Sequence, residues 1–258
     1  SVANTVGTGS FTIPLMKKMG YRPQFAGAVE AAASTGGMIM PPVMGAGAFV
    51  MAEITGIPYV KIMVGAALGA ILYYTSIAIR VHFIAVRDNL KGLSKDEVIS
   101  FKDLVKDLYL LLPLAGLVYM LLTGFSPFMA ASVAILSSFA ISFFSKKTMM
   151  TPKRLWDTLR LSGQNMIMIA LACAGAGMVV SIVTHTGLGL GIAAVITSWS
   201  KGLLFPALFL IMITALILGM GLPCTPSYII AITIGGPALA ALGCDLLASH
   251  LFVFYFAM

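Results

Sequence analysis

The chain has 258 residues, of which 59% are hydrophobic and 10% are charged. A soluble domain has about 25% charged residues, so the polar residues of this chain are too few to cover a water-facing surface. The mean hydropathy of +1.00 therefore indicates that lipid is the main solvent. The net charge of +7 does not indicate nucleic-acid binding, because the basic residues fall in short runs between apolar stretches, as in loops that flank membrane spans.

The two ends and the cysteines say little about chemistry. The sequence opens on SVANTVGTGS, without an initiator Met or a basic leader, and it ends inside an apolar run, so we interpret it as a piece of a longer protein. Cys173, Cys224 and Cys244 form no C-x-x-C pair. We interpret them as small hydrophobic side chains of helices.

Apolar stretches with charged borders predict an all-α polytopic membrane protein. The stretch at 5–16 is too short to span a bilayer, and the stretch at 24–52 is interrupted by STGGMIMPP at 34–42. The other predicted elements, in chain order, are spans at 57–79, 108–123, 126–144 and 164–184, an interfacial amphipathic helix at 188–201, two half-length segments at 203–219 and 227–242, and a span that begins near Leu246.

The polar segment 85–107 carries alternating charges and predicts a cytoplasmic loop with an amphipathic helix, since so few residues cannot bury a core. We therefore divide the chain into residues 1–84, 85–107 and 108–258, with the first and last as the two membrane regions.

The basic residues give the orientation. When the spans are threaded in order, 14 of the 16 Lys and Arg residues fall on one side, and only Lys61 and Lys201 fall on the other. The positive-inside rule makes the first side cytoplasmic. This threading requires that residues 5–16 enter and leave on the cytoplasmic side. It also requires that residues 203–242 enter and leave on the opposite side. Both are therefore predicted to belong to re-entrant hairpins.

Three polar interruptions are the candidate binding segments. SVANTVGTGSFTIP at 1–14 places Ser, Asn, Thr and Gly at the start of a half-span, where hydroxyls, amides and unpaired backbone groups suit a small cation or a carboxylate. The Gly and Pro residues of 34–42 stop a helix inside an apolar stretch. GMGLPCTPS at 219–227 repeats the first layout, a polar tip and then an apolar helix, with the opposite topology. The alternatives are a water-exposed cap, a structural kink and a plain loop.

Single residues carry weaker signals. A carboxylate at Glu30 is costly in an apolar stretch, but Glu30 lies only eight residues after Arg22, which leaves open that it reaches the cytoplasmic interface. His185 and His250 are expected at the interface. The sequence contains no H-E-x-x-H, G-x-S-x-G or P-loop motif and no paired intramembrane aspartates, so we do not expect an enzyme.

The block from ANTVGTGSFTIPLMKKMGYRP to GAFVMAEITGIPY resembles the large membrane subunit of TRAP transporters, the tripartite ATP-independent periplasmic carriers, as do LILGMGLPCTPSYIIA and ASHLFVFYFAM. The chain is most similar to the DctM-like type in which the small and large subunits are fused. The resemblance implies an inverted-repeat, elevator-type secondary transporter with re-entrant helical hairpins and broken helices. It also implies that the first half of hairpin 1, the small-subunit portion and the second Pro-Pro break lie outside this chain.

The resemblance further implies sodium-coupled uptake of an organic acid, such as a C4-dicarboxylate, with Na⁺ as the coupling ion and no other cofactor. By analogy, Asn4, Thr35, Gly221 and Thr225 would be Na⁺ ligands. The complete expected sodium- and substrate-binding set is Ser1, Asn4, Thr5, Gly7, Ser34, Thr35, Gly37, Met40, Pro41, Pro42, Gly219, Gly221, Pro223, Thr225 and Ser227. Cys224 stands where the family commonly has a hydroxyl residue.

The implied partners are a periplasmic solute receptor of the TAXI or DctP type, a small membrane subunit, an organic anion and the lipid of a bacterial inner membrane. Two alternatives stay open. A related elevator carrier for dicarboxylate or citrate would need no receptor. A channel or a membrane-embedded enzyme would belong to another class, and the enzyme would need acid, His or metal-ligand pairs within the membrane.

Overall fold

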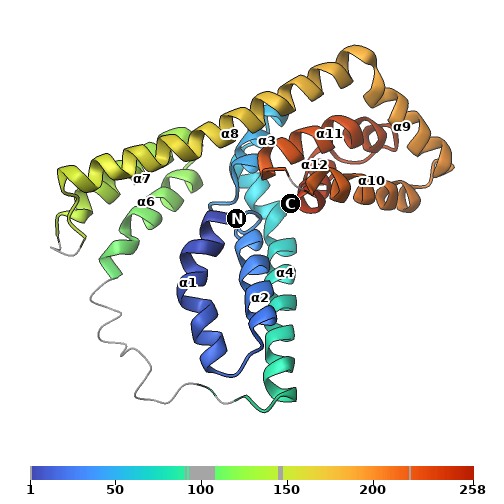
Figure 1. Ribbon diagram of the computed structural model, residues 1–258. Coiled ribbons are helices and arrows are strands. Elements are labelled where there is room, and N and C mark those ends of the chain that lie inside the picture. Colours follow the sequence, from blue (N-terminus) through green and yellow to red (C-terminus); the bar gives the residue numbers. More distant parts are fainter. Residues whose placement is uncertain (1, 91, 93–107, 145–147, 221) are drawn as a thin grey trace. The chain divides into compact units, whose positions relative to one another are not determined.

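The computed structural model describes residues 2–90, 92, 108–144, 148–220 and 222–258, and within them it contains helices and no strands (Figure 1). The predicted all-α fold is confirmed for this part of the chain. The helices are α1 (Val2–Lys18), α2 (Pro23–Gly36), α3 (Ala46–Thr55), α4 (Tyr59–Arg87), the 3-10 helix η2 (Leu108–Leu111), α6 (Leu112–Leu122), α7 (Pro127–Ser142), α8 (Pro152–Thr186), α9 (Leu188–Trp199), α10 (Leu204–Gly219), α11 (Cys224–Ala241) and α12 (Leu246–Ala257).

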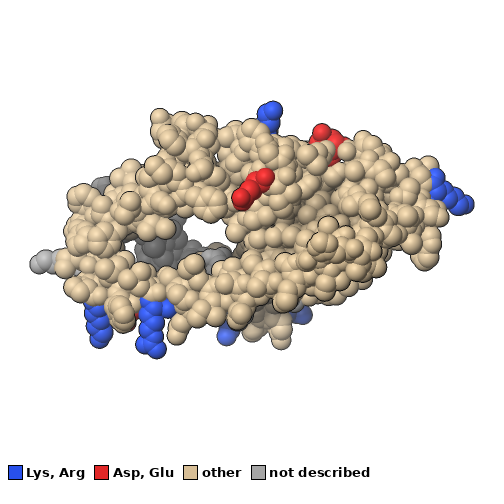
Figure 2. All heavy atoms as spheres, turned by 90° about the horizontal axis from the view of Figure 1, so that it is seen from above, with Lys and Arg blue, Asp and Glu red and all other residues tan. Residues whose placement is uncertain are grey.

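Helix length and composition support a multi-pass membrane protein. Among the described residues, α4, α8 and α11 are long and apolar enough to cross a membrane, and six shorter segments of 10–17 residues are also apolar. Large hydrophobic side chains stay on the surface, with Phe205 81% and Phe11 80% exposed. Figure 2 shows a face that consists almost entirely of uncharged residues, with a few charged side chains projecting from it. Such a surface is stable in lipid and not in water.

The predicted interruptions coincide with real helix ends. Helix α2 ends at Gly36 and α3 begins at Ala46, so the helix stops within the predicted segment 34–42. The turn between α6 and α7 contains Gly124, whose φ of +86° is a conformation that residues with a side chain rarely adopt. The Gly and Pro residues of the sequence therefore predicted these helix ends correctly.

Two charged borders did not mark helix ends. Helix α4 continues past Arg80 to Arg87, and α8 begins at Pro152, 12 residues before the predicted span at 164–184. The predictions at 57–79 and 164–184 were of membrane spans, and each helix covers all or nearly all of its predicted span and extends beyond it. A charged residue shows where a helix leaves the hydrocarbon, but the backbone hydrogen bonds continue into the headgroup region or water.

The end of α4 is a polar boundary. The guanidinium of Arg87 donates from Nε to Oδ1 of Asp88 at 2.8 Å. This hydrogen bond lowers the pKa of the Asp88 carboxyl, so the pair stays ionised. Asn89 then takes a left-handed conformation with φ of 49°, which ends the helix. The predicted loop continues into residues 91 and 93–107, which lie outside the described residues.

The chain divides into two compact units, residues 1–44 with 66–141 and residues 45–65 with 142–258. In the first unit, α1 and α2 pack side by side (Figure 1). In the second unit, α11 packs against α3, α8, α9, α10 and α12. Helix α11 is apolar around its whole circumference, as expected of a helix that is covered on all sides.

The core of the second unit contains a polar pair. The Tyr228 hydroxyl on α11 and Nδ1 of His250 on α12 are 2.6 Å apart, and both side chains are buried. The Tyr228 ring also meets Phe254 edge-on at a centroid distance of 5.4 Å. The His250 ring is thus covered by protein, and the expectation that it lies at the depth of the membrane interface stays a prediction.

We expect Tyr228→Phe to lower the thermal unfolding temperature of the full-length protein in detergent. The substitution leaves the buried His250 nitrogen without its partner, which costs about 1–3 kcal/mol. Tyr119→Phe is the matched control, since the Tyr119 side chain is 67% exposed, and it should leave the temperature unchanged. Equal unfolding temperatures for wild type and Tyr228→Phe would contradict the structural role of this pair.

Candidate functional site

The first predicted segment forms the beginning of α1. Ser1 lies outside the described residues, as does the side chain of Asn4. Thr5 is half-buried and Gly7 is exposed, with no atom within 4 Å of the position where a Cβ would stand. The Gly7 carbonyl accepts a hydrogen bond from the Ser10 hydroxyl at 2.7 Å, and its expected part in binding stays a prediction.

The second segment is a tight, irregular turn between α2 and α3. The amides of Ile39 and Met40 both donate to the Gly36 carbonyl, at 3.1 and 3.0 Å, and Met44 donates to Met40 at 3.2 Å. Pro41 and Pro42 are joined by a cis peptide bond. Within the segment, Ser34 is buried, whereas Gly37 is exposed.

Two tyrosines of α4 support the end of α2. The Tyr73 hydroxyl donates to the Ala32 carbonyl and the Tyr74 hydroxyl donates to the Ala33 carbonyl, each at 2.9 Å. Gly36 permits this approach, because a Cβ there would stand 2.7 Å from the Tyr73 ring. The Ala33 carbonyl also accepts the Gly37 amide at 3.2 Å, so the tyrosine hydroxyls are additional donors that tie α4 to the end of α2. Sequence patterns did not reveal the two tyrosines, which lie 37 and 38 residues after Gly36.

The third segment is the tip between α10 and α11. Pro223 precedes α11 without a side-chain cap, so the first amides of that helix are free of side-chain partners at its positive end. Thr225 and Ser227 are buried, at 9% and 0% exposure. Gly221, which was expected to bind Na⁺ through its backbone, lies outside the described residues.

The tip of the third segment rests on the end of α12. The Ser227 hydroxyl donates to the Ala257 carbonyl at 2.8 Å. A Cβ on Gly219 would stand 2.7 Å from that same oxygen, so glycine is required for this contact. Gly47, which follows the second segment, packs on Phe254 of the same helix end, where a Cβ would stand 2.9 Å from the ring. Three small residues from three helices thus meet the last turn of α12.

The structure brings together Gly47, Gly219 and Ser227 around α12, in the second unit. The first segment and residues 34–42 lie in the first unit. Among the residues that sequence reasoning missed, Ala257 gave no signal, because it acts through a backbone carbonyl.

The first unit also contains a polar cluster that the predicted set does not include. The hydroxyls of Thr8 and Thr12 on α1 donate to the two carboxylate oxygens of Glu30 on α2. Glu30 is 7% exposed, so its side chain is covered by protein, and the alternative that it lies at the depth of the cytoplasmic interface stays open. The four-residue spacing of the two threonines was a signal that could have paired them with an acidic residue on a neighbouring helix.

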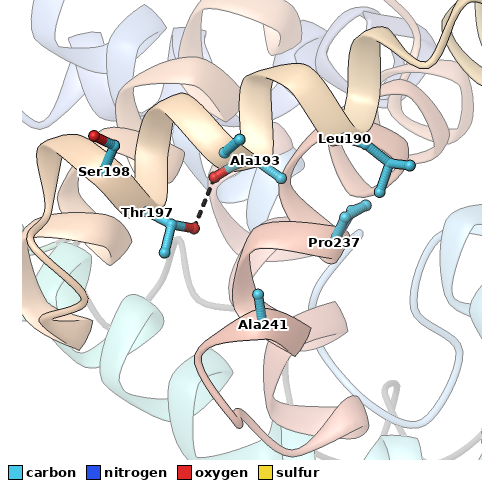
Figure 3. Close-up of a pocket in the computed structure, with 7 residues that line it drawn as sticks. Leu190, Ala193, Thr197, Ser198, Pro237 and Ala241 are labelled. Atoms are coloured by element: carbon cyan, nitrogen blue, oxygen red, sulfur yellow. Dashed lines mark hydrogen bonds between the residues drawn. The ribbon is translucent and has the colours of Figure 1, made fainter.

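A groove between α9 and α11 is lined by apolar side chains. Figure 3 shows Leu190, Ala193, Pro237 and Ala241 around it, and the Thr197 hydroxyl is bonded to the Ala193 carbonyl at 2.7 Å. The groove contains no charged group and no residue of the predicted binding set. The groove is therefore separate from the predicted binding segments.

In the described part of the chain, no group of three or more His, Cys, Asp and Glu side chains could hold a metal ion. Sodium needs no such group, because hydroxyls and backbone carbonyls bind it. The geometry thus provides exposed or broken backbone at helix ends rather than reactive side chains.

Comparison with known proteins gives one result. The sequence matches the family described as "Tripartite ATP-independent periplasmic transporter, DctM component" over residues 1–258. Searches of curated proteins and of solved structures gave no match.

We expect Gly219→Ala to destabilise the second unit. The new Cβ would overlap the Ala257 carbonyl, and a backbone neighbour cannot move away as a flexible side chain could, so the cost is about 1–3 kcal/mol. Gly191→Ala on α9 is the control, because no atom lies within 4 Å of its Cβ position. Thermal unfolding of the two purified full-length variants should separate them, and an equally stable Gly219→Ala protein would refute the packing described for the tip.

Proposed function

The chain belongs to the DctM component family of tripartite ATP-independent periplasmic transporters, and we propose that it takes up an organic acid together with Na⁺. Members of this family are permease subunits of secondary transporters and not enzymes, and they act with a periplasmic receptor and a small membrane subunit. The proposal adds the coupling ion, a carboxylate substrate, a receptor of the TAXI or DctP type, and a bacterial inner membrane.

The observation that carries the proposal is the match over the whole chain, together with helix interruptions at the segments expected to bind. An interrupted helix presents backbone carbonyls to a cation and amides to an anion within the membrane. The break after Gly36 and the tip after Gly219 are both of this kind. The apolar surface allows these segments to operate at membrane depth.

The elevator mechanism is part of the proposal. In it, the hairpin-bearing core would move as a body and expose the bound solute to one side and then the other. The contact of Gly219 and Ser227 with α12 supports movement as a body, because it joins the tip to a neighbouring helix. The alternative is a related carrier that needs no receptor. It predicts uptake in the absence of the binding protein, and the liposome uptake assay described next tests it.

We expect solute uptake by the full-length protein, reconstituted in liposomes with its small subunit and receptor, to require an inward sodium gradient. Labelled succinate or another C4-dicarboxylate is the first solute to test. Replacing external sodium by choline should reduce uptake to the level of empty liposomes. Equal uptake in choline would remove the sodium claim, and full uptake without receptor would favour the receptor-independent carrier.

We expect Asn4→Ala to raise the sodium concentration that gives half-maximal uptake by about tenfold, which corresponds to about 1.4 kcal/mol for one lost ligand. Asn165→Ala is the control, since Asn165 is exposed on α8 and lies outside the predicted set. The measurement is initial uptake rate against sodium concentration. A wild-type sodium curve for Asn4→Ala would exclude its side chain from the sodium site.

A further inference from the structure

Glu30 is a buried carboxylate in an apolar helix of a membrane protein. It is 7% exposed, and residues such as Ala26 and Ser34 on the same helix are also buried. An ionised side chain within the bilayer costs several kcal/mol unless protein groups solvate it. A carboxylate kept at such a place therefore has a task that an apolar residue could not perform.

Two hydrogen-bond partners of Glu30, Thr8 and Thr12, lie on one face of α1, and a third partner, Ser34, lies on α2 itself. The Thr8 hydroxyl donates to Oε1, and the Thr12 hydroxyl donates to Oε2 at 2.5 Å. Thr8 and Thr12 are one helical turn apart, so both hydroxyls point to the same side of α1. Gly9 lies between them and lets α2 approach, because a Cβ there would stand 3.2 Å from the Glu30 Cγ. We call Thr8, Gly9, Thr12 and Glu30 the α1–α2 clasp.

The α1–α2 clasp fixes two degrees of freedom. One hydrogen bond alone would let α1 rotate or slide, but two bonds to two oxygens of one carboxylate define both the rotation and the axial position of the helix. Apolar contacts are less selective, and between helices in lipid they bring no hydrophobic driving force. The relative register of α1 and α2 therefore depends on the polar contact.

The α1–α2 clasp overlaps the first binding segment, residues 1–14, and adjoins the second, residues 34–42. Thr8 follows Gly7 and lies one turn after Asn4, while Glu30 lies one turn before Ser34. A change of half a turn in α1 would move its polar tip by several ångströms relative to the break in α2, and oxygen ligands of a cation must match their distances within a few tenths of an ångström.

We propose that Glu30 is a positioning residue of the transporter, which holds the tip of α1 against the break of α2 through Thr8 and Thr12. This inference rests on the proposed function, because it places the ligands expected for sodium. In the described part of the chain, Glu30 forms no ion pair with Lys, Arg or His. Its partners are neutral donors, so the role depends on hydrogen bonds and shape and not on the negative charge.

The test uses the full-length protein with its small subunit and receptor. Glu30→Leu removes both acceptors, and the double variant Thr8→Val with Thr12→Val removes both donors with little change in shape. Glu30→Gln keeps the length of the side chain and can still pair with both threonines, through its oxygen and its amide. Glu53→Leu is the control, because Glu53 is exposed on α3.

Two measurements are made on each variant. The first is hydrogen exchange of the α1 amides in detergent, which reports the docking of α1 independently of transport. The second is the half-saturating sodium concentration of uptake. We expect faster α1 exchange and an increase of about five- to thirtyfold in half-saturating sodium for Glu30→Leu and for the double threonine variant, as for the loss of one to two hydrogen bonds. Glu30→Gln and Glu53→Leu should stay within about twofold of wild type.

Two outcomes overturn the proposal. If Glu30→Gln impairs uptake as strongly as Glu30→Leu while α1 exchange stays at the wild-type rate, Glu30 acts through its charge and not by position. If the double threonine variant changes neither measurement, the clasp does not hold α1. Should wild-type uptake prove independent of sodium, the proposed coupling fails, and the exchange rates of the same variants still decide whether the clasp exists.

Discussion

Lipid cannot form hydrogen bonds, and this constraint governs the remainder of the structure. A helix that stops inside a bilayer leaves carbonyls and amides that only protein groups can satisfy. At the end of α2, amides of the following turn donate to the Ala33, Thr35 and Gly36 carbonyls. Tyr73 and Tyr74 add hydroxyl donors from α4 to the Ala32 and Ala33 carbonyls. Gly36 is small because two aromatic rings must reach the backbone there. The end of α2 at this break is thus stabilised by specific residues of α4.

The two units use different interactions to hold their breaks. In the first unit, a carboxylate and two threonine hydroxyls join α1 to α2. In the second unit, the glycine at 219 and the hydroxyl of Ser227 join the hairpin tip to a backbone carbonyl of α12. The two bonds of the carboxylate join two side chains of α1 to one side chain of α2, whereas the Ser227 hydroxyl and Gly219 both meet one backbone oxygen. Helix α11 also packs against α3, α8, α9 and α10.

Much of the helix order could be predicted from the sequence, because apolar length and the Gly and Pro residues act locally. The break near 34–42 and the tip near 219–227 are examples. The ends of α4 and α8 could not be predicted from charged borders, because a helix continues beyond the hydrocarbon. The contacts of Tyr73 with α2 and of His250 with Tyr228 join residues that are distant in sequence, and no local pattern encodes them. The binding set itself rests on resemblance, and three of its members, Ser1, Asn4 and Gly221, have positions or side chains outside the described residues.

The length of α8 has a mechanical consequence. Its 35 residues extend for about 52 Å, while the hydrocarbon core is about 30 Å thick. The surplus carries Lys153, Arg154 and Arg160, and Trp156 is 69% exposed among them. Any piston-like shift that drew this end inward would bring a cation into hydrocarbon, at about 2.5–3.5 kcal/mol for each. The charged end of α8 is therefore expected to stay outside the hydrocarbon.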